Sequence, residues 1–544
     1  MNYRKDTDIY KLYLVTDSGM LPEGTTLFSQ VEKAVKAGVT LVQIREKDSD
    51  TKDFIAEALE VKKLCNEYKV PLIINDRIDV ALAIGADGVH VGQDDMPIPM
   101  VRDLVGPDMI IGWSVGKTSE VQQLAEWGPD YVDYIGIGTL FPTETKKNSK
   151  KVPMGPQGAI RILDALQEYK ADWCRTVGIG GLHAPNIPRV LYQCTSSDGK
   201  RALDGISLVS DIMASPTADV ATKRLLEFLD DTTYSYLGDL NLQSNDEPTS
   251  HDFHDVLAQV AENRPLVQHV TNKVHQNFGA NVTLALGASP IMSEIESEVG
   301  ELCRIPNAAL LLNTGSVAPL SMLKTAVAAY NEVTRPIVFD PVGYSATTTR
   351  KDLNDALLSY GQYACIKGNS GEILGLAGLN SSSMKGVDAT STASDAELIQ
   401  SATRIVAYRY KTIAVCTGET DYICDGTVGG RRFISTGSGI GPDDLDMYYV
   451  QDGHIPMMGD ITASGCSLGS TIASLVGGLG PDGSVFNAVV AAVVLYKSAG
   501  RLAADGCDGS GSFHVRLIDN LYKLTRVNNP DTWSAVLKKI DDSE

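Results

Sequence analysis

The stretch Val177-Gly178-Ile179-Gly180-Gly181 closes a short apolar run in the first half of the chain, and Gly459-Asp460-Ile461-Thr462-Ala463-Ser464-Gly465-Cys466 precedes a long apolar stretch in the second half. Glycine-rich turns between a strand and a helix present backbone N–H groups to phosphate. Each turn lies in its own alternation of short apolar runs and helical patterns. The sequence therefore predicts two α/β domains, each with its own anion-binding site.

Around the first turn, short apolar runs alternate with helical patterns such as Thr51–Tyr68. The eight runs are Leu12–Val15, Leu41–Ile44, Leu72–Ile74, Gly88–Val91, Ile110–Trp113, Tyr131–Ile135, Thr176–Gly178 and Gly205–Leu208. Eight strands with crossover helices are typical of a (β/α)8 TIM barrel. The carboxyl ends of barrel strands share one face, so the polar residues that follow these runs are expected to converge there.

The types of these polar residues indicate their chemistry. Gln43, Arg45 and Lys47 alternate along one run, so the strand period of two directs an amide and two cations to the same side. Asp76 and Asp95 follow two neighbouring runs and supply carboxylate oxygens of the kind that Mg²⁺ takes beside substrate phosphates. This set predicts a site for a polar heterocycle that carries a metal-bound diphosphate.

A second anionic group is predicted on the same face. Gly180-Gly181 follows the seventh run, and Val209-Ser210 follows the eighth, which is the common phosphate position in TIM barrels. Each feature alone also fits a simpler interpretation, because a strand-end cation is often solvated and paired glycines mark any turn. Their combination favours a site. An isomerase or aldolase barrel is the alternative, and it would need a catalytic Lys or a Glu pair inside the barrel.

Residues 9–228 resemble thiamine phosphate synthase. The resemblance rests on Gln43–Lys47, Ile74-Asn75-Asp76, Gly88–Asp95, Pro142–Lys147 and Val177–Gly181. It implies Mg²⁺ as cofactor and hydroxymethylpyrimidine diphosphate and a thiazole phosphate as substrates. The residues it implies are Gln43, Arg45, Lys47, Asn75, Ser114 and Lys146 for the pyrimidine diphosphate, Asp76 and Asp95 for Mg²⁺, and Thr143, Thr145, Gly181, Val209 and Ser210 for the thiazole phosphate.

The second half predicts an open, helix-flanked α/β sheet, because its glycine-rich turn comes late and introduces the helical stretch Ser467–Leu479. Asp340 at a strand end and Glu372 in a first helical turn are predicted as direct or water-mediated Mg²⁺ ligands. Free N–H groups ahead of the late helix suit phosphoryl transfer. Cys466 opens that helix, where a lowered thiol pKa is expected; a lone Cys there is also commonly a packed small hydrophobe.

Residues 254–541 resemble hydroxyethylthiazole kinase, which has a ribokinase-like fold. The resemblance rests on Gly287–Met292, Asp340–Gly343, Lys367–Glu372, Thr417–Glu419 and Ala463–Cys466. It implies that Met292 and Ala463 contact hydroxyethylthiazole, that Lys367 and Thr417 contact the co-substrate ATP, and that Cys466 takes the proton of the substrate hydroxyl. It also implies trimers or hexamers formed through this domain.

The polar, acidic stretch 229–252 is predicted to link domains 1–228 and 253–544. The two implied reactions are consecutive, so the chain is expected to be a bifunctional enzyme of thiamine biosynthesis. A synthase barrel fused to a catalytically silent scaffold that senses thiazole or thiamine is the alternative.

Composition limits the partners. The formal net charge is −21, which disfavours nucleic acid and anionic membranes. Nine cysteines without a CxxC pair indicate reduced thiols. The start of the chain does not resemble a signal peptide, and no window is expected to approach the ~20 apolar residues of a membrane helix. We therefore expect a cytoplasmic protein.

Overall fold

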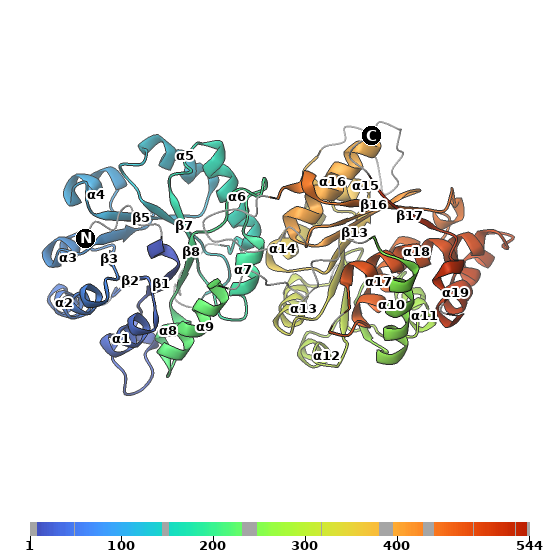
Figure 1. Ribbon diagram of the computed structural model, residues 1–544, viewed down its shortest axis with the longest axis horizontal. Helices are drawn as coiled ribbons and strands as arrows, with labels where there is room; N and C mark the ends of the chain where they lie inside the picture. Colours follow the sequence, from blue (N-terminus) through green and yellow to red (C-terminus); the bar gives the residue numbers. More distant parts are fainter. Residues whose placement is uncertain are drawn as a thin grey trace. The chain divides into compact units, whose positions relative to one another are not determined.

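The computed structural model of the protein describes residues 8–47, 49–143, 152–230, 247–316, 318–379, 395–427, 440–481, 483–527 and 529–540. The chain divides into two compact units, one with strands β1 to β8 and the other with β9 to β17 (Figure 1). Thr145, Lys146 and most of the predicted linker 229–252 lie outside the described residues. Helix α10 starts at Ser250, inside that predicted linker.

The first unit is a closed barrel of eight parallel strands, as predicted, and β1 pairs with both β2 and β8. Its strands are β1 Leu12–Val15, β2 Leu41–Ile44, β3 Leu72–Asn75, β4 Gly88–Val91, β5 Ile110–Val115, β6 Tyr134–Ile137, β7 Arg175–Ile179 and β8 Gly205–Leu208. The predicted start of the sixth strand at Tyr131 is wrong. The Tyr131 N–H donates to the Gly128 carbonyl (3.3 Å) in a turn, so pairing begins only at Tyr134.

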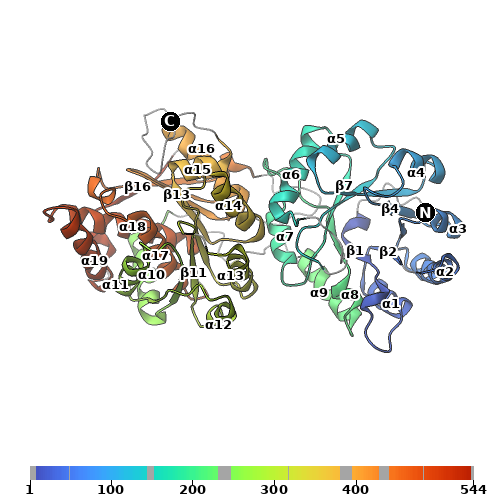
Figure 2. The same ribbon diagram turned by 180° about the vertical axis from the view of Figure 1, so that it is seen from behind.

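Helices surround this barrel (Figures 1 and 2). They are α1 Leu27–Ala37, α2 Thr51–Tyr68, α3 Ile78–Ile84, α4 Ile98–Val105, α5 Thr118–Trp127, α6 Gly155–Glu168, α7 Ile187–Gln193, α8 Ser210–Met213 and α9 Ala218–Asp230. At the amino-terminal end of the strands, Tyr10 packs against Gly205 and against the Tyr134 ring, with ring centroids 5.1 Å apart. Because side chains fill this end, the carboxyl end is the place for a substrate.

The second unit holds an open sheet, as predicted, and the described residues give it nine strands in the order β10-β9-β11-β12-β13-β14-β15-β16-β17. Strands β9 to β14 are parallel to one another, and β15, β16 and β17 each pair antiparallel with the strand before them. The bounds are β9 Leu266–Val270, β10 Ser289–Ile291, β11 Ala309–Asn313, β12 Ile337–Asp340, β13 Cys365–Asn369, β14 Ile413–Thr417, β15 Asp421–Asp425, β16 Met447–Gln451 and β17 Val536–Lys539.

Two groups of helices accompany this sheet. One group is α10 Ser250–Asn263, α11 Gln276–Ala285, α17 Ser464–Gly477, α18 Val485–Ala504 and α19 Ser510–Val527, which pack on one another. The other is α12 Val299–Leu302, α13 Leu320–Glu332, α14 Thr348–Tyr360, α15 Ser370–Ala377 and α16 Asp395–Tyr410. Buried side chains of the first group, together with inward-facing strand residues, form the main core of the unit.

Helix α18 corrects one expectation from the sequence. By length and composition alone, this helix of 20 residues is long and apolar enough to cross a membrane. The expectation that no segment approaches the length of an apolar membrane helix is therefore wrong. However, 78% of its most apolar window is buried inside the protein. Side chains such as Val489, Val493 and Leu495 belong to the core, where burying each contributes roughly 1.5–3 kcal/mol. Packing within the unit therefore accounts for the apolar composition of this helix.

Candidate active sites

A chain of buried polar side chains crosses the barrel interior and reaches two of the predicted pyrimidine ligands. The Gln43 amide donates to the Tyr13 hydroxyl, which lies 2.7 Å from the Tyr134 hydroxyl. That hydroxyl lies 2.9 Å from Nδ1 of His90, whose Nε2 lies 3.0 Å from Oγ of Ser114. Because each group has a partner, the network holds its members in fixed orientations. Gln43 and Ser114 thus form the two ends of this buried polar network.

Sequence reasoning missed three members of this network, Tyr13, His90 and Tyr134. The signal was present, because a tyrosine or histidine inside a short apolar strand needs a hydrogen-bond partner when it is buried. Which partner it takes depends on the closure of the barrel, since these residues come from β1, β4 and β6.

Asp76 and Asp95, the predicted Mg²⁺ ligands of the barrel, lie together. Burial and the hydrogen-bonded Asp95 carboxyl group raise the pKa of Asp76 to about 6, while Lys47 and Asn75 act in the opposite direction. Nζ of Lys47 lies 3.6 Å from Oδ2 of Asp76. Two adjacent carboxyl groups with a single lysine 3.6 Å from one of them fit a divalent cation, which would remove their repulsion.

The described residues hold no group of three or more His, Cys, Asp or Glu side chains suited to a metal ion. Oxygens of a substrate and of water would therefore have to complete the coordination of a cation at Asp76 and Asp95, as is usual for Mg²⁺.

The predicted alternation of Gln43, Arg45 and Lys47 along one strand is wrong, because β2 ends at Ile44. The Arg45 N–H donates to Oγ1 of Thr16 (3.0 Å), and its guanidinium lies 3.7 Å from Oδ2 of Asp17. Lys47 instead reaches Asp76. The two cations stand at the carboxyl end of the barrel through loop contacts, and the strand period does not place them.

The predicted thiazole phosphate residues come from the ends of β6, β7 and β8. Gly181 has φ +63°, and a Cβ there would lie 2.4 Å from the Pro142 carbonyl, next to Thr143. Asp211 joins the two later strand ends, because its carboxylate accepts from the Ala184 N–H (2.6 Å) and lies 2.6 Å from Nδ1 of His183. Val209 packs on the barrel core, and Ser210 opens α8. The structure thus places these segments side by side.

In the second unit, Asp340 ends β12 and Glu372 lies in the first turn of α15, as predicted. Oδ2 of Asp340 accepts from Asn313 (2.7 Å) and pairs with Lys367 (2.9 Å), and all three are buried. The Glu372 oxygens accept the N–H groups of Gly343 (2.7 Å) and Asn369 (2.8 Å). Burial and the nearby Asp340 raise the pKa of Glu372 to about 7.

Cys466 lies in the first turn of α17, where two amides converge on its sulfur. Nδ2 of Asn272 lies 3.3 Å and Nδ2 of Asn313 lies 3.2 Å from Sγ. Burial and Asp340 raise the pKa of this thiol, although Lys367 and the two amides lower it. The expectation of a lowered pKa is therefore wrong, because desolvation and the Asp340 charge outweigh the effects of Lys367 and the two amides. Sequence reasoning also missed both asparagines, which come from separate strand ends.

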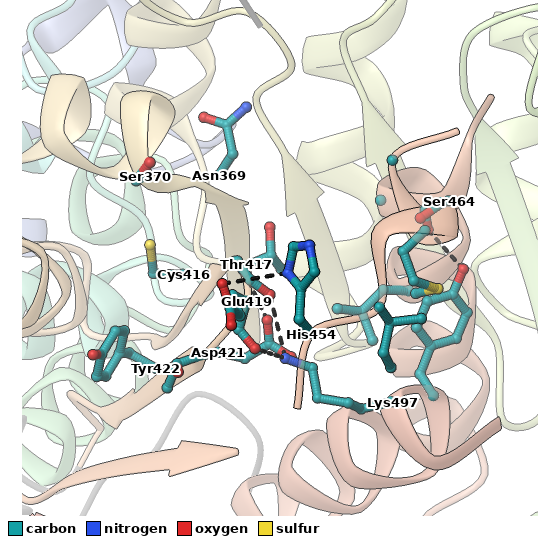
Figure 3. A pocket seen from close by; sticks show the side chains of 18 of the residues that line it. Asn369, Ser370, Cys416, Thr417, Glu419, Asp421, Tyr422, His454, Ser464 and Lys497 are labelled. Atoms are coloured by element: carbon teal, nitrogen blue, oxygen red, sulfur yellow. Dashed lines mark hydrogen bonds and ion pairs between the residues drawn. The ribbon is translucent and has the colours of Figure 1, made fainter. Parts of the chain in front are cut away.

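A cavity of about 860 Å³ lies beside the first turn of α17 (Figure 3). Its walls include Thr417 and the turn that follows it, Asn369 and Ser370 at the start of α15, and Ser464 and Gly465 at the start of α17. Among the residues that the structure describes, no side chain caps α17, so its first N–H groups are available to an anion.

Three other residues predicted for the kinase site, Lys367, Met292 and Ala463, are not among the residues that line this cavity. Lys367 pairs with Asp340 and is not part of the cavity wall. Met292 follows the edge strand β10, and Ala463 precedes α17 with φ +65° and packs on the core. Contacts of Met292 and Ala463 with a thiazole, and of Lys367 with ATP, stay predictions.

Two family models match the chain. The model described as Thiamine monophosphate synthase matches residues 12–212, and the Hydroxyethylthiazole kinase family model matches residues 257–527. The chain is also 43% identical over 216 residues to a thiamine-phosphate synthase of Clostridium novyi. The aligned residues cover 40% of this chain and 97% of that enzyme.

Relatives with the same two-part organisation match nearly the whole chain. A probable thiamine biosynthetic bifunctional enzyme of Schizosaccharomyces pombe is 37% identical over 523 residues, which cover 95% of each chain. The thiamine biosynthetic bifunctional enzyme of Saccharomyces cerevisiae is 68% identical over 541 residues, covering 99% of this chain and 100% of that protein. The chain therefore belongs to the family of thiamine biosynthetic bifunctional enzymes, with a thiamine phosphate synthase barrel and a hydroxyethylthiazole kinase unit in one polypeptide.

Proposed function

We propose that the chain catalyses two consecutive steps. The second unit phosphorylates 4-methyl-5-(2-hydroxyethyl)thiazole with ATP. The barrel then joins the thiazole phosphate to hydroxymethylpyrimidine diphosphate, which yields thiamine phosphate and diphosphate. The observation that carries this proposal is the presence of two separate sites in one chain, a carboxylate pair with cations at the barrel mouth and a cavity beside the first turn of α17.

In the barrel, we assign the pyrimidine to Gln43 and Ser114, the two ends of the buried polar network. Arg45 and Lys47 face the diphosphate, and Asp76 and Asp95 would hold Mg²⁺. Mg²⁺ would supply positive charge for the diphosphate oxygens. The C–O bond to the diphosphate breaks with its electron pair on the leaving group, and the thiazole nitrogen attacks the pyrimidinylmethyl cation that remains. No nucleophilic side chain is needed, so the main task of the site is electrostatic stabilisation.

The thiazole phosphate is assigned to the ends of β6, β7 and β8. Support comes from the close packing of Gly181 on the Pro142 loop and from the ties that Asp211 makes between the β7 and β8 ends. Thr143, Val209 and Ser210 lie on these same segments. The predicted contacts of Thr145 and Lys146 belong to the proposal as well.

In the second unit, we assign ATP to the cavity, with its phosphates toward the N–H groups of Ser464 and Gly465. Sγ of Cys466 takes the proton of the substrate hydroxyl as the hydroxyl oxygen attacks the γ-phosphorus. Oδ1 of Asp340 has no partner among the described contacts and would bind Mg²⁺ directly. Both Glu372 oxygens already accept N–H groups, which favours a water-mediated contact.

We further propose that the chain acts in the cytoplasm and assembles as trimers or hexamers through the kinase unit. All nine cysteines are free, which suits a reducing compartment. Light scattering of the purified protein tests the oligomeric state, and a monomer would refute that part of the proposal.

The test of the two activities is a reaction with ATP, Mg²⁺, hydroxyethylthiazole and hydroxymethylpyrimidine diphosphate, with each component left out in turn. We expect thiamine phosphate only when all four are present. If product forms only from ready-made thiazole phosphate, the second unit is not a kinase, and a thiazole-binding or thiamine-binding scaffold becomes the better description.

A further inference from the structure

The turn between β14 and β15 forms one wall of the proposed nucleotide cavity. Residues 417 to 421, Thr417-Gly418-Glu419-Thr420-Asp421, all line the cavity. The turn is too short for internal backbone hydrogen bonds to satisfy every group, so its shape must depend on contacts from other elements. Oγ1 of Thr417 donates to the Gly368 carbonyl (3.2 Å), which fixes only the start of the turn.

The rest of the turn is held by one lysine of α18. Nζ of Lys497 donates to the carbonyl oxygens of Gly418 (3.2 Å) and Glu419 (2.7 Å) and pairs with Oδ2 of Asp421 (3.0 Å). Figure 3 shows Lys497 beside Glu419 and Asp421. Oδ1 of the same aspartate accepts the Gly418 N–H (2.9 Å). An ammonium group has three N–H donors, and this turn supplies three acceptors.

Because the Lys497–Asp421 pair is buried, breaking it carries a large free-energy cost. The Lys497 side chain is 9% exposed and that of Asp421 is 7% exposed. If either partner is removed, a buried charge remains without its counterion, so the turn must open toward water or rearrange. The described wall contains one other basic side chain, His454, whose Nδ1 lies 3.4 Å from Glu419 in an exposed pair.

We propose that Lys497 is a positioning residue for the nucleotide, which shapes the Thr417–Asp421 wall and does not itself bind phosphate. All three of its N–H donors already have acceptors, although the side chain lines the cavity. The phosphates are then left to the first N–H groups of α17 and to the metal ion. This inference rests on the proposed assignment of ATP to the cavity.

The test compares Lys497→Met with Asp421→Asn in the full-length enzyme. For Lys497→Met we expect the KM for ATP to rise at least about tenfold, which corresponds to about 1.4 kcal/mol. The kcat at saturating ATP should stay within about threefold, and the KM for hydroxyethylthiazole within about twofold. Lys523→Met on the exposed side of α19 is the matched control and should change none of these values.

Asp421→Asn separates positioning from direct binding. If Lys497 shapes the turn, Asp421→Asn also raises the KM for ATP, and the double variant is little worse than the more damaging single variant, because both changes break one unit. If Lys497 binds phosphate, Asp421→Asn frees the cation and leaves the KM for ATP unchanged or lower, which would overturn the inference. An unchanged KM for ATP in Lys497→Met would overturn it too.

Failure of the proposed function gives a different result. In that case the wild-type chain shows no ATP-dependent phosphorylation of hydroxyethylthiazole, whatever the variants do. Should Lys497→Met fold poorly, the milder Asp421→Asn variant still decides between the two roles. Synthase activity in the same preparations reports the amount of chain with a folded barrel, to which the kinase rates are normalised.

Discussion

Replacement of Gly181 by Ala should disable the synthase and spare the kinase. The residue has φ +63°, and its Cβ would lie 2.4 Å from the Pro142 carbonyl oxygen and 2.8 Å from Phe141. A Cβ atom essentially never lies within 3.0 Å of such an atom, so the loop before Thr143 must move by about 0.6 Å or more. Displacements approaching 1 Å in a site commonly cost about 100-fold in rate. We expect a loss of about that size in kcat/KM for thiazole phosphate.

Gly85→Ala is the matched control, because Gly85 has φ +61° and the nearest atom to its Cβ position is Nζ of Lys62 at 3.8 Å. The left-handed backbone costs both alanine variants about 1–2 kcal/mol of stability. The clash exists only at Gly181. Both proteins should therefore melt at a lower temperature than the wild type, but only Gly181→Ala should lose synthase activity.

The assay supplies ready-made thiazole phosphate and follows thiamine phosphate by chromatography, so that the kinase step is bypassed. Kinase activity is measured separately on the same protein and should be unchanged within about twofold. If Gly181→Ala keeps synthase activity within about threefold of Gly85→Ala, the close packing at this turn does not shape the phosphate site and the reasoning is refuted.

Four other predictions concern single residues. Cys466→Ala should lower kinase kcat by at least about 100-fold and leave synthase rates unchanged; unaltered kinase rates would remove the thiol from the mechanism. Asp76→Ala and Asp95→Ala should each abolish Mg²⁺-dependent coupling but not phosphorylation, and normal coupling in either variant would contradict its role as a metal ligand. Tyr134→Phe removes a buried hydroxyl with two partners, so it should lower barrel stability by about 1–3 kcal/mol and raise the KM for the pyrimidine substrate, as denaturation and kinetics will show. Burial lowers the pKa of His269 from 6.5 to about 4, so the unfolded chain binds more protons than the folded chain between these pH values. The free energy of unfolding should therefore fall as the pH drops from 6.5 toward 4. His269→Gln should flatten this dependence of the unfolding free energy on pH.

Much of the fold was open to prediction because local signals and tertiary structure agree. Seven of the eight barrel strands start within a residue or so of the predicted apolar runs, since each strand is buried and bounded by polar turns. The sixth strand starts late because Tyr131 is used in a turn, and apolar composition does not reveal turn hydrogen bonds. For helix α18, composition alone does not decide the environment, because an apolar helix in a protein core and one in a membrane have the same composition.

The candidate sites divide in the same way. The identities of Asp76, Asp95, Asp340 and Cys466 as polar or reactive groups at element ends were visible in the sequence. The direction of the Cys466 pKa shift was not, because desolvation depends on which residues cover the thiol. Asn313 ends β11, and nothing local in the sequence indicates that it faces Asp340 and Cys466.

By itself, the sequence determined the two α/β units and the types of chemical group at their strand ends, because strand periodicity and glycine turns are local properties of the chain. The family of each unit came from the resemblance of its motifs. Only the tertiary structure decided the partners of those groups: the Tyr13–Tyr134–His90 network, the amides on Cys466 and the hold of Lys497 on the Thr417–Asp421 turn. These contacts join residues that are from 44 to 194 positions apart. Hydrogen bonds and desolvation act over a few ångströms in space, so they follow from how the elements pack and not from the order of residues along the chain.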